Sequence, residues 1–211
     1  MRYERKYKIE NLSYSLVEQS IRLHPAGFRK IFPDRQVNNI YFDTSDWTTF
    51  KENVMGIAER KKFRVRWYGE DLQAIEKPIF EIKIKSNQLG DKISHPITPF
   101  QLSNLDLTLN EIQNLSEAKV PLHPTLLNSY HRSYFGTPDG KFRITTDQKL
   151  RYFSLLNNSK FNAYRIEDKE IVMELKYDQT LDSATDRITQ HFPFRMTKSS
   201  KYVSGIELVN S

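Results

Sequence analysis

In one short stretch of the chain, from Arg60 to Tyr68, basic residues occupy alternate positions up to Arg66. In an extended strand successive side chains point to opposite faces, so Lys62, Arg64 and Arg66 line one face while apolar side chains line the other. Neighbouring cations on such a face lie about 7 Å apart and repel one another. The spacing therefore favours a surface that binds an anion, and the alternative is an ordinary solvent-exposed strand face.

The same alternation recurs along the chain. Basic residues line one face of further predicted strands, namely Lys6 and Lys8, Lys83 and Lys85, Arg132, Arg143, and Lys176. Solvent exposure of one strand face would explain each pattern taken singly. Solvent-exposed faces usually mix both charges with neutral polar residues, however, whereas here Lys and Arg repeat from strand to strand. If the strands curl with these faces inward, the cations line an interior that requires bound anions.

A few acidic residues share these basic faces. Glu174 lies on the face of Lys176, and Glu81 lies on the face of Lys83. Each carboxylate either pairs with its basic neighbour or, beside bound phosphates, holds Mg²⁺ or Mn²⁺, which take oxygen ligands from carboxylates and phosphates together. Asp147 is open to the same metal-binding interpretation, or it orients an arginine. The residues alone leave these alternatives open.

The pattern of apolar residues predicts the elements that position these side chains. Strands are predicted at residues 3–10, 37–42, 57–68, 80–85, 129–135, 141–147, 171–177 and 202–209, with weaker ones at 150–153 and 162–166. Helices are predicted within residues 16–23, 47–54, 99–118, 126–127 and 184–192, and residues 28–32 are predicted to be a basic connector. Strands at antiparallel-compatible spacing with helices between them predict an α+β protein built on a closed or nearly closed antiparallel β-barrel.

Length and composition set further bounds. The chain has 211 residues, 38% of them hydrophobic, which is enough for a substantial core, and no linker or repeat divides it, so we expect a single domain over residues 1–211. A formal net charge of +6 favours acidic partners. The absence of cysteine excludes thiolate metal sites and cysteine nucleophiles. The charged N-terminus and the lack of a long apolar run predict a soluble, cytoplasmic protein without an integral membrane segment.

Several segments, in order along nearly the whole chain, match one known pattern. They are ERKY (4–7), YFDT (41–44), KFRVRWY (62–68), FEIK (80–83), YHR (130–132), RITTD (143–147), MELKY (173–177) and SKY (200–202). Each segment alone is a weak signal, but together they resemble the VTC-type polyphosphate polymerase domain, within the CYTH or triphosphate tunnel metalloenzyme superfamily. That resemblance implies a closed, eight-stranded antiparallel barrel with helices packed outside, whose basic tunnel grips a triphosphate or polyphosphate.

The resemblance also implies roles for individual residues. Catalytic roles at the transferred phosphate are expected for Arg64, Arg66, Lys83, Arg132 and Arg143. Substrate-binding roles are expected for Lys6, Lys62, Lys85, Lys176, Lys198 and Lys201. Glu174 is expected to hold the metal cofactor, Mn²⁺ or Mg²⁺. Whether Lys198 or Lys201 reaches the tunnel is left open by the sequence.

The first strand distinguishes between branches of the superfamily. Hydrolases of the CYTH type carry a Glu-x-Glu-x-Lys strand, whereas the corresponding positions here are Glu4, Lys6 and Lys8. This departure favours the VTC branch. Eukaryotic members carry a regulatory domain and a transmembrane part beside this domain, so we expect the chain to resemble the stand-alone prokaryotic form, for which a membrane-protein partner is compatible with the resemblance.

The resemblance implies phosphoryl transfer from ATP or another nucleoside triphosphate to a growing inorganic polyphosphate chain. One alternative is a metal-dependent hydrolase of tripolyphosphate or nucleoside triphosphates. A second alternative is a non-catalytic module that binds polyphosphate or another polyanion. Nucleic acid is not an expected partner, because Phe63, Trp67 and Phe80 alternate with the cations and therefore lie on the opposite strand face, away from a basic stacking surface.

Overall fold

The computed structural model describes residues 2–86, 89–156 and 165–210 of the chain. The chain forms two compact units, each assembled from separate stretches. The first unit comprises Met1–Arg35, Tyr130–Leu150 and Asp168–Ser199, and the second comprises Gln36–Ser129, Arg151–Glu167 and Ser200–Ser211. This division does not test the expectation of a single domain, which stays a prediction.

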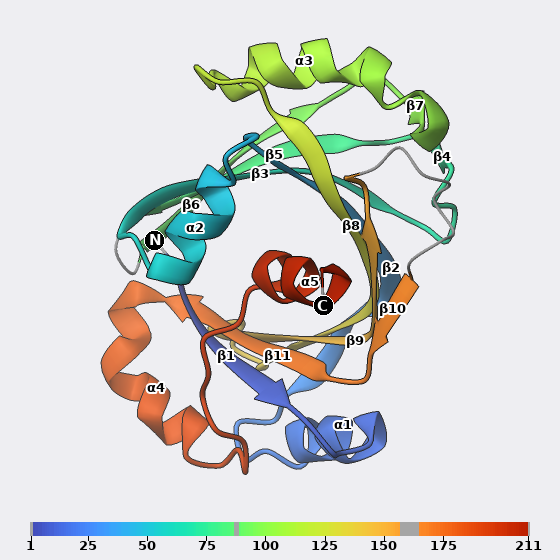
Figure 1. Cartoon of the computed structure of the whole chain (residues 1–211). Helices are drawn as coiled ribbons and strands as arrows, with labels where there is room; N and C mark the ends of the chain where they lie inside the picture. The colour runs from blue at the N-terminus through green and yellow to red at the C-terminus, as the bar shows by residue number, and fades with distance from the viewer. Residues whose placement is uncertain (1, 87–88, 157–164, 211) are drawn as a thin grey trace. The chain divides into compact units, whose positions relative to one another are not determined.

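The first unit is an antiparallel sheet with helices on one face. Its strands are β1 (Arg2–Ile9), β11 (Ile171–Asp178), the first part of β9 (Phe142–Ser154), the second part of β8 (His123–Gly136) and the first part of β2 (Arg29–Asp43). Its helices are α1 (Tyr14–Arg22), the short 3-10 helix η2 (Gln179–Leu181) and α4 (Asp182–Thr189). Strand β11 lies between β1 and β9, and Figure 1 shows α1 and α4 beside these strands.

The core of the first unit follows from the alternation of its strands. Tyr7, Ile144 and Met173 point to the helix-covered face and are buried with Val17 and Ile21 of α1. Residues at the intervening positions therefore point to the other, polar face. In the register of the sheet, the residues that meet on that face are Lys6, Glu174 and Thr145, followed one step along by Glu4, Lys176 and Arg143.

The second unit is also built on antiparallel strands. Its strands are the second part of β2, β3 (Glu59–Tyr68), β5 (Ile79–Ser86), β6 (Leu89–Pro96), the first part of β8 and the end of β9, with β10 (Arg165–Asp168) beside β9 and a small pair, β4 (Ala74–Ile75) and β7 (Phe100–Gln101). Its helices are α2 (Thr48–Met55), the 3-10 helix η1 (Leu102–Asn104), α3 (Asp106–Ser116) and α5 (Lys201–Val209). Neighbouring strands follow the order β6, β5, β3, β2 and β8.

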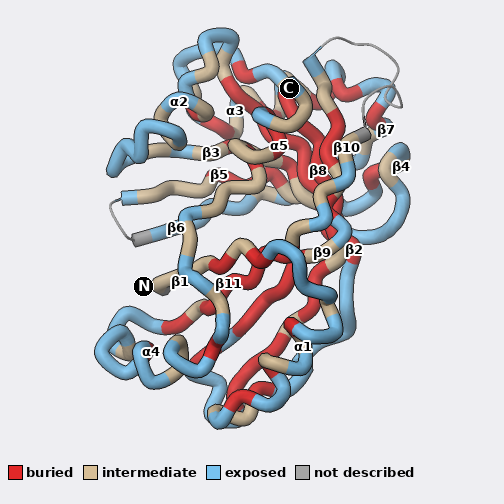
Figure 2. The backbone as a smooth tube through the Cα atoms, turned by 60° about the horizontal axis from the view of Figure 1, so that its bottom comes forward, coloured by how far each residue is buried: buried red, intermediate tan, exposed pale blue. Residues whose placement is uncertain are grey.

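The second core contains the apolar face of the basic stretch. Phe63, Val65 and Trp67 are buried and pack in one cluster with Leu105 and Ile112, which come from α3 and the turn before it. In Figure 2 much of the length of the central strands is buried, whereas the helices keep one side exposed. The cations at the intervening positions of β3 consequently lie on the opposite face of the sheet.

Three local predictions are wrong. Residues 126–127 continue strand β8 instead of forming a helix, and residues 29–32 belong to strand β2 instead of a connector. The predicted strand at 202–209 is helix α5, which buries Tyr202, Gly205 and Ile206 at helical spacing. The Ser200 side chain accepts a hydrogen bond from the Val203 N–H and so caps this helix. Most of the weak strand predicted at 162–166 lies outside the described residues.

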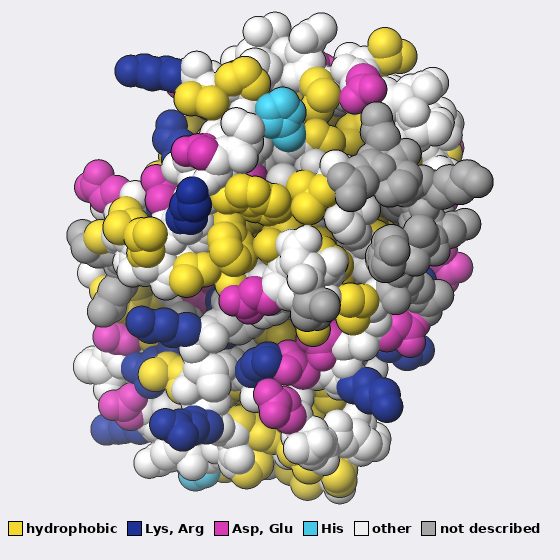
Figure 3. Space-filling view, viewed as in Figure 1, with side chains coloured by type: hydrophobic (Ala, Val, Ile, Leu, Met, Phe, Trp, Pro, Cys, Tyr) yellow, Lys and Arg dark blue, Asp and Glu magenta, His cyan; other side chains and the backbone are white. Residues whose placement is uncertain are grey.

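The α+β class and the mostly antiparallel sheet are confirmed. Within the described stretches, none of the helices has the length and apolarity that crossing a membrane requires. On the face of the molecule shown in Figure 3, Lys and Arg side chains are interspersed with Asp and Glu. That face therefore does not present one continuous basic patch, and the basic strand faces inside each unit become the relevant anion-binding candidates.

Candidate phosphate-binding site

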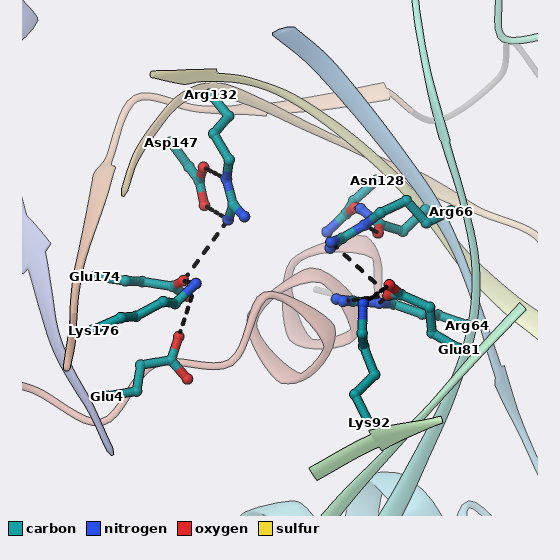
Figure 4. Close-up of polar contacts among 11 residues, drawn as sticks. Glu4, Arg64, Arg66, Glu81, Lys92, Asn128, Arg132, Asp147, Glu174 and Lys176 are labelled. Carbon is teal, nitrogen blue, oxygen red and sulfur yellow. Dashed lines mark hydrogen bonds and ion pairs between the residues drawn. The ribbon is translucent and has the colours of Figure 1, made fainter. Parts of the chain in front are cut away.

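A buried carboxylate lies at the centre of the polar face of the first unit. Glu174, of which 6% is exposed, has its Oε1 atom 3.2 Å from Lys6 Nζ and its Oε2 atom 2.9 Å from Lys176 Nζ. Arg132 Nη2 lies 3.8 Å from Oε2. Lys176 Nζ is also 3.6 Å from the carboxylate of Glu4. Figure 4 shows Glu4, Arg132 and Lys176 converging on Glu174. We call these residues, with Lys6 and Asp147, the Glu174 cluster.

The orientation of Arg132 is fixed by Asp147. Its Nε and Nη2 atoms donate to the two carboxylate oxygens of Asp147 over 2.6 and 2.7 Å, and its guanidinium lies over the Tyr130 ring at 5.3 Å. Burial disfavours the charged guanidinium, but the charges of Asp147, Tyr130 and Glu174 hold the pKa of Arg132 well above its ordinary value. Of the two interpretations of Asp147, the structure therefore shows the arginine-orienting one.

A second buried carboxylate organises the polar face of the second unit. Glu81, of which 3% is exposed, accepts hydrogen bonds over 2.6 Å from Arg64 Nε and from Lys92 Nζ, and Arg66 Nη1 lies 3.9 Å away. Burial alone would raise the pKa of Glu81, but Arg64, Arg66 and Lys92 outweigh it and lower the pKa to about 2. The carboxylate is therefore ionised at neutral pH. We call these four residues the Glu81 cluster, which Figure 4 also shows.

The other basic residues of the second unit that were expected at the site lie on β3, on β5 and at the start of α5. Lys83 is opposite Lys62 in the register of β3 and β5, and Lys85 is opposite Arg60. Lys62 Nζ lies 3.0 Å from Ser200 Oγ, at the N-terminus of helix α5. Lys201 is the first residue of α5 and is half-buried. A helix N-terminus beside lysines favours negative charge.

Arg143 and Lys198 occupy more open positions in the first unit. Arg143 is exposed and lies opposite Lys176 in the register of β9 and β11, on the face that carries Glu174. Lys198 is exposed, in the segment that precedes α5. Lys6 reaches the same segment, since its Nζ atom donates to the carbonyl of Ser199 over 3.2 Å. The structure thus brings Lys6, but not Lys198, into direct contact with Glu174 among the contacts of the described residues.

Sequence reasoning missed Lys92 and the buried amides of the second unit. Strand β6, which carries Lys92, is short of apolar residues, so no strand was predicted there. Asn39 and Asn128 are fully buried polar residues on strands β2 and β8. The sequence does contain a signal for these two residues, because an asparagine at a buried position of a strand requires a hydrogen-bond partner. The partner itself comes from a distant part of the chain and is not readable from the sequence.

The surroundings of Glu174 bear on whether it can hold a divalent cation. Both of its oxygens are in contact with ammonium groups, and no group of three or more His, Asp or Glu suited to a metal occurs in the described stretches. One buried carboxylate, with Glu4 nearby across Lys176, does not make a site supplied by protein ligands alone. It does fit Mg²⁺ or Mn²⁺ held jointly by one carboxylate and the oxygens of a bound phosphate.

The fold is similar to those of several solved structures. A candidate adenylate cyclase from Bacillus halodurans matches with a TM-score of 0.58 and 12% identity, over 97% of this chain and 96% of that chain. One from Vibrio parahaemolyticus matches with a TM-score of 0.55 and 15% identity, over 96% and 97%. A candidate adenylyl cyclase from Hippeastrum, described as having a dominant triphosphatase activity, matches with a TM-score of 0.52 and 12% identity, over 99% and 96%. At such identities the likeness shows the fold alone.

No curated protein matches the chain. The model of one protein family, described as the VTC domain, matches residues 1–210. That match covers all the strands and helices that carry the Glu174 and Glu81 clusters, and it agrees with the order of basic segments in the sequence. The chain therefore belongs to the VTC domain family.

Proposed function

We propose that this protein is an enzyme that transfers the terminal phosphate of ATP, or of another nucleoside triphosphate, to the end of a growing inorganic polyphosphate chain. The observation that carries the proposal is the gathering of three cations around each of two buried carboxylates, Glu174 and Glu81. Membership of the VTC domain family supports it. A cytoplasmic location, where ATP is available, is part of the proposal.

The proposal includes the closed, eight-stranded barrel that the resemblance implies. In such a barrel basic strand faces line a tunnel, and the linear anion lies along it. The antiparallel order of strands within each unit supports this arrangement. A tunnel also gives a physical reason for cations on so many strands, because a polyphosphate carries negative charge along its whole length.

Phosphoryl transfer is catalysed mainly by positioning the reacting phosphates and neutralising their charge, and less by covalent chemistry of the protein. The guanidinium groups of Arg64, Arg66, Arg132 and Arg143 are suited to bidentate contacts with phosphate oxygens. The lysines, Lys6, Lys62, Lys83, Lys85, Lys176 and Lys201, would bind as point charges, with Lys198 at the margin. Asp147 and Glu81 keep Arg132 and Arg64 in place before the anion arrives.

Glu174 would hold Mn²⁺ or Mg²⁺ against the phosphate oxygens, where the ion would supply neutralisation of the negative charge. The carboxylate must then exchange Lys6 and Lys176 for the ion, and the freed ammonium groups can turn to the phosphates. Metal dependence is an implication of the family resemblance that this donor set accommodates.

Hydrolysis is the second candidate function, because the relative from Hippeastrum is described as a triphosphatase. Water then replaces the chain end as the acceptor, and the same cations serve. One assay separates the candidates: the protein is incubated with ATP and Mn²⁺ or Mg²⁺, and long-chain polymer is resolved on a gel while free phosphate is measured. Polymer supports the transferase, and free phosphate without polymer supports the hydrolase. Binding of tripolyphosphate with neither product would overturn both enzymatic functions and leave a binding module.

A further inference from the structure

A chain of hydrogen bonds leads from the Glu81 cluster into the buried part of the second unit. Arg66 Nε donates to Asn39 Oδ1 over 2.8 Å, and Asn39 Nδ2 donates to Asn128 Oδ1 over 2.8 Å. The three residues come from the neighbouring strands β3, β2 and β8. Both asparagines are fully buried.

The direction of this chain is forced by chemistry. A guanidinium group only donates hydrogen bonds, so Asn39 must present its oxygen to Arg66 and turn its nitrogen toward Asn128. Asn128 must then present its oxygen to Asn39. Its nitrogen, Nδ2, is left at the end of the chain, and it has no hydrogen-bond partner in the described part of the molecule. Flipping either amide would bring two donors face to face, so rotation of the amides does not remove the unpaired donor.

A buried donor without an acceptor is unfavourable, because the group has lost its hydrogen bonds to water. The unpaired Nδ2 group of Asn128 therefore does not stabilise the free protein. Figure 4 shows where it points: its polar end lies beside the guanidinium of Arg66, on the side of the strands to which Arg64 and Glu81 also turn. Arg64 and Arg66 already have acceptors in Glu81 and Asn39, whereas Asn128 Nδ2 lacks one in the described part of the molecule, and an oxygen of an anion bound by Arg66 would supply it.

We propose that Asn128 is a further substrate-binding residue, whose Nδ2 group donates a hydrogen bond to a phosphoryl oxygen of the anion that Arg66 binds. This inference rests on the proposed function, since it takes the phosphate chain as the ligand. Asn39 is a positioning residue, which holds the Arg66 guanidinium in line with that donor. Because an amide is neutral, Asn128 adds affinity and geometry without adding charge.

Because the Asn128 donor is neutral, the salt dependence of binding distinguishes a direct contact with the anion from a purely structural role. The slope of affinity against salt concentration reports how many ionic contacts a polyanion makes. Removing Arg66 should flatten that slope, whereas removing the Asn128 amide should weaken binding and leave the slope unchanged. If Asn128 acted only by orienting Arg66 through Asn39, the two substitutions would change the slope alike.

The experiment measures inorganic tripolyphosphate binding to the full chain by calorimetry at several salt concentrations. Asn128→Ala should weaken binding by about tenfold to a hundredfold, as expected for one lost hydrogen bond to a charged group. It should also weaken binding in the Arg66→Ala background. Asn38→Ala is the matched control: Asn38 is equally buried on strand β2, but its nitrogen donates to the Gly69 carbonyl over 2.8 Å. That control should change the affinity by less than about twofold.

Thermal melting verifies that each variant is folded, and Asn128→Ser, which keeps a hydroxyl near Asn39, replaces Asn128→Ala if the latter does not fold. Wild-type affinity in a folded Asn128 variant would overturn the inference and leave the proposed function standing. So would an Asn128 effect that vanishes in the Arg66→Ala background. Failure of the unchanged protein to bind tripolyphosphate would overturn the inference and the proposed function together.

Discussion

At the scale of single residues, the two buried carboxylates act as internal counter-ions. Glu174 and Glu81 each hold cations that would otherwise repel one another on a strand face. Under the proposed function, a buried carboxylate in this position takes the place of the phosphate until the substrate binds. The consequence is that each carboxylate also competes with phosphate for the same cations, and substitutions at the two positions separate these effects.

Replacing Glu174 with Gln should affect binding and turnover in opposite directions. Without metal, tripolyphosphate should bind more tightly than to the unchanged protein, because Lys6 and Lys176 are released from the carboxylate. Metal-dependent turnover of ATP should be lost, because the proposed metal ligand is absent. Calorimetry in the presence of a chelator gives the first quantity and phosphate release with Mn²⁺ gives the second. Full metal-dependent activity in Glu174→Gln would rule out the metal role.

The lowered pKa of Glu81 predicts that the folded protein loses stability in acid. Its pKa falls from an ordinary 4.5 to about 2 in the folded protein, so its stabilising contribution is complete above pH 4.5 and is lost as the pH falls toward 2. Between pH 5 and pH 3 this loss amounts to about 2 kcal/mol. Urea unfolding should show that Glu81→Gln, although less stable at neutral pH, loses about 2 kcal/mol less over that interval than the unchanged protein. Parallel pH curves for the two proteins would contradict the assignment.

At the scale of elements, side-chain packing holds helix α5 in its position. Tyr202 OH donates to the buried carboxylate of Asp43 over 2.6 Å, and the Tyr202 ring stacks on Tyr41 at 5.1 Å. Asp43 also accepts hydrogen bonds from the backbone N–H groups of Thr49 and Phe50, at the start of α2. One carboxylate thus joins the end of β2 to two helices, which places the first turn of α5 close to Lys62.

Gly205 is required by this packing and not by helix formation. A Cβ atom there would lie 2.5 Å from Leu126 Cδ2 and 2.6 Å from Tyr152 Cδ1, and both of these side chains are buried. Gly205→Ala should therefore destabilise the protein by about 1–3 kcal/mol, although alanine is the better helix former. Thermal melting measures the effect, with Ser204→Ala on the same helix as the control. An increase in melting temperature for Gly205→Ala would show that α5 is not held against these residues.

At the scale of the whole molecule, the number of anions that one chain binds is the property to measure. The chain carries 32 Lys and Arg against 26 Asp and Glu, a net charge of +6 that favours a polyanion at long range. Net charge alone does not say how many anions bind. The number bound per chain therefore tests whether the Glu174 and Glu81 clusters share a ligand.

A shared site predicts one tripolyphosphate per chain in calorimetry. Arg64→Ala and Arg132→Ala, which alter the Glu81 and Glu174 clusters respectively, should each weaken that single binding event by about tenfold or more. Arg187→Ala, which removes an exposed cation of α4, is the control for net charge and should leave the affinity nearly unchanged. Two tripolyphosphates per chain, each sensitive to only one of the substitutions, would show two separate sites instead.

The sequence by itself determined which side chains share a face. The alternation around Arg64 and Arg66 placed both on a polar face and their apolar neighbours in a core, because the two-residue period of a strand is a local property of the backbone. The same reasoning placed Glu174 with Lys176. The order of such segments along the chain was sufficient to indicate the family.

Only the tertiary structure decided which of these groups meet. Asp147 orients Arg132, Lys92 joins Glu81, and Asn128 ends the chain of hydrogen bonds from Arg66. Each of these pairings depends on strand register between distant segments, which no local pattern encodes. Helix α5 shows the same dependence on tertiary structure. Its apolar residues are equally compatible with a strand, and it is the packing of Gly205 against Leu126 and Tyr152 that favours the helix.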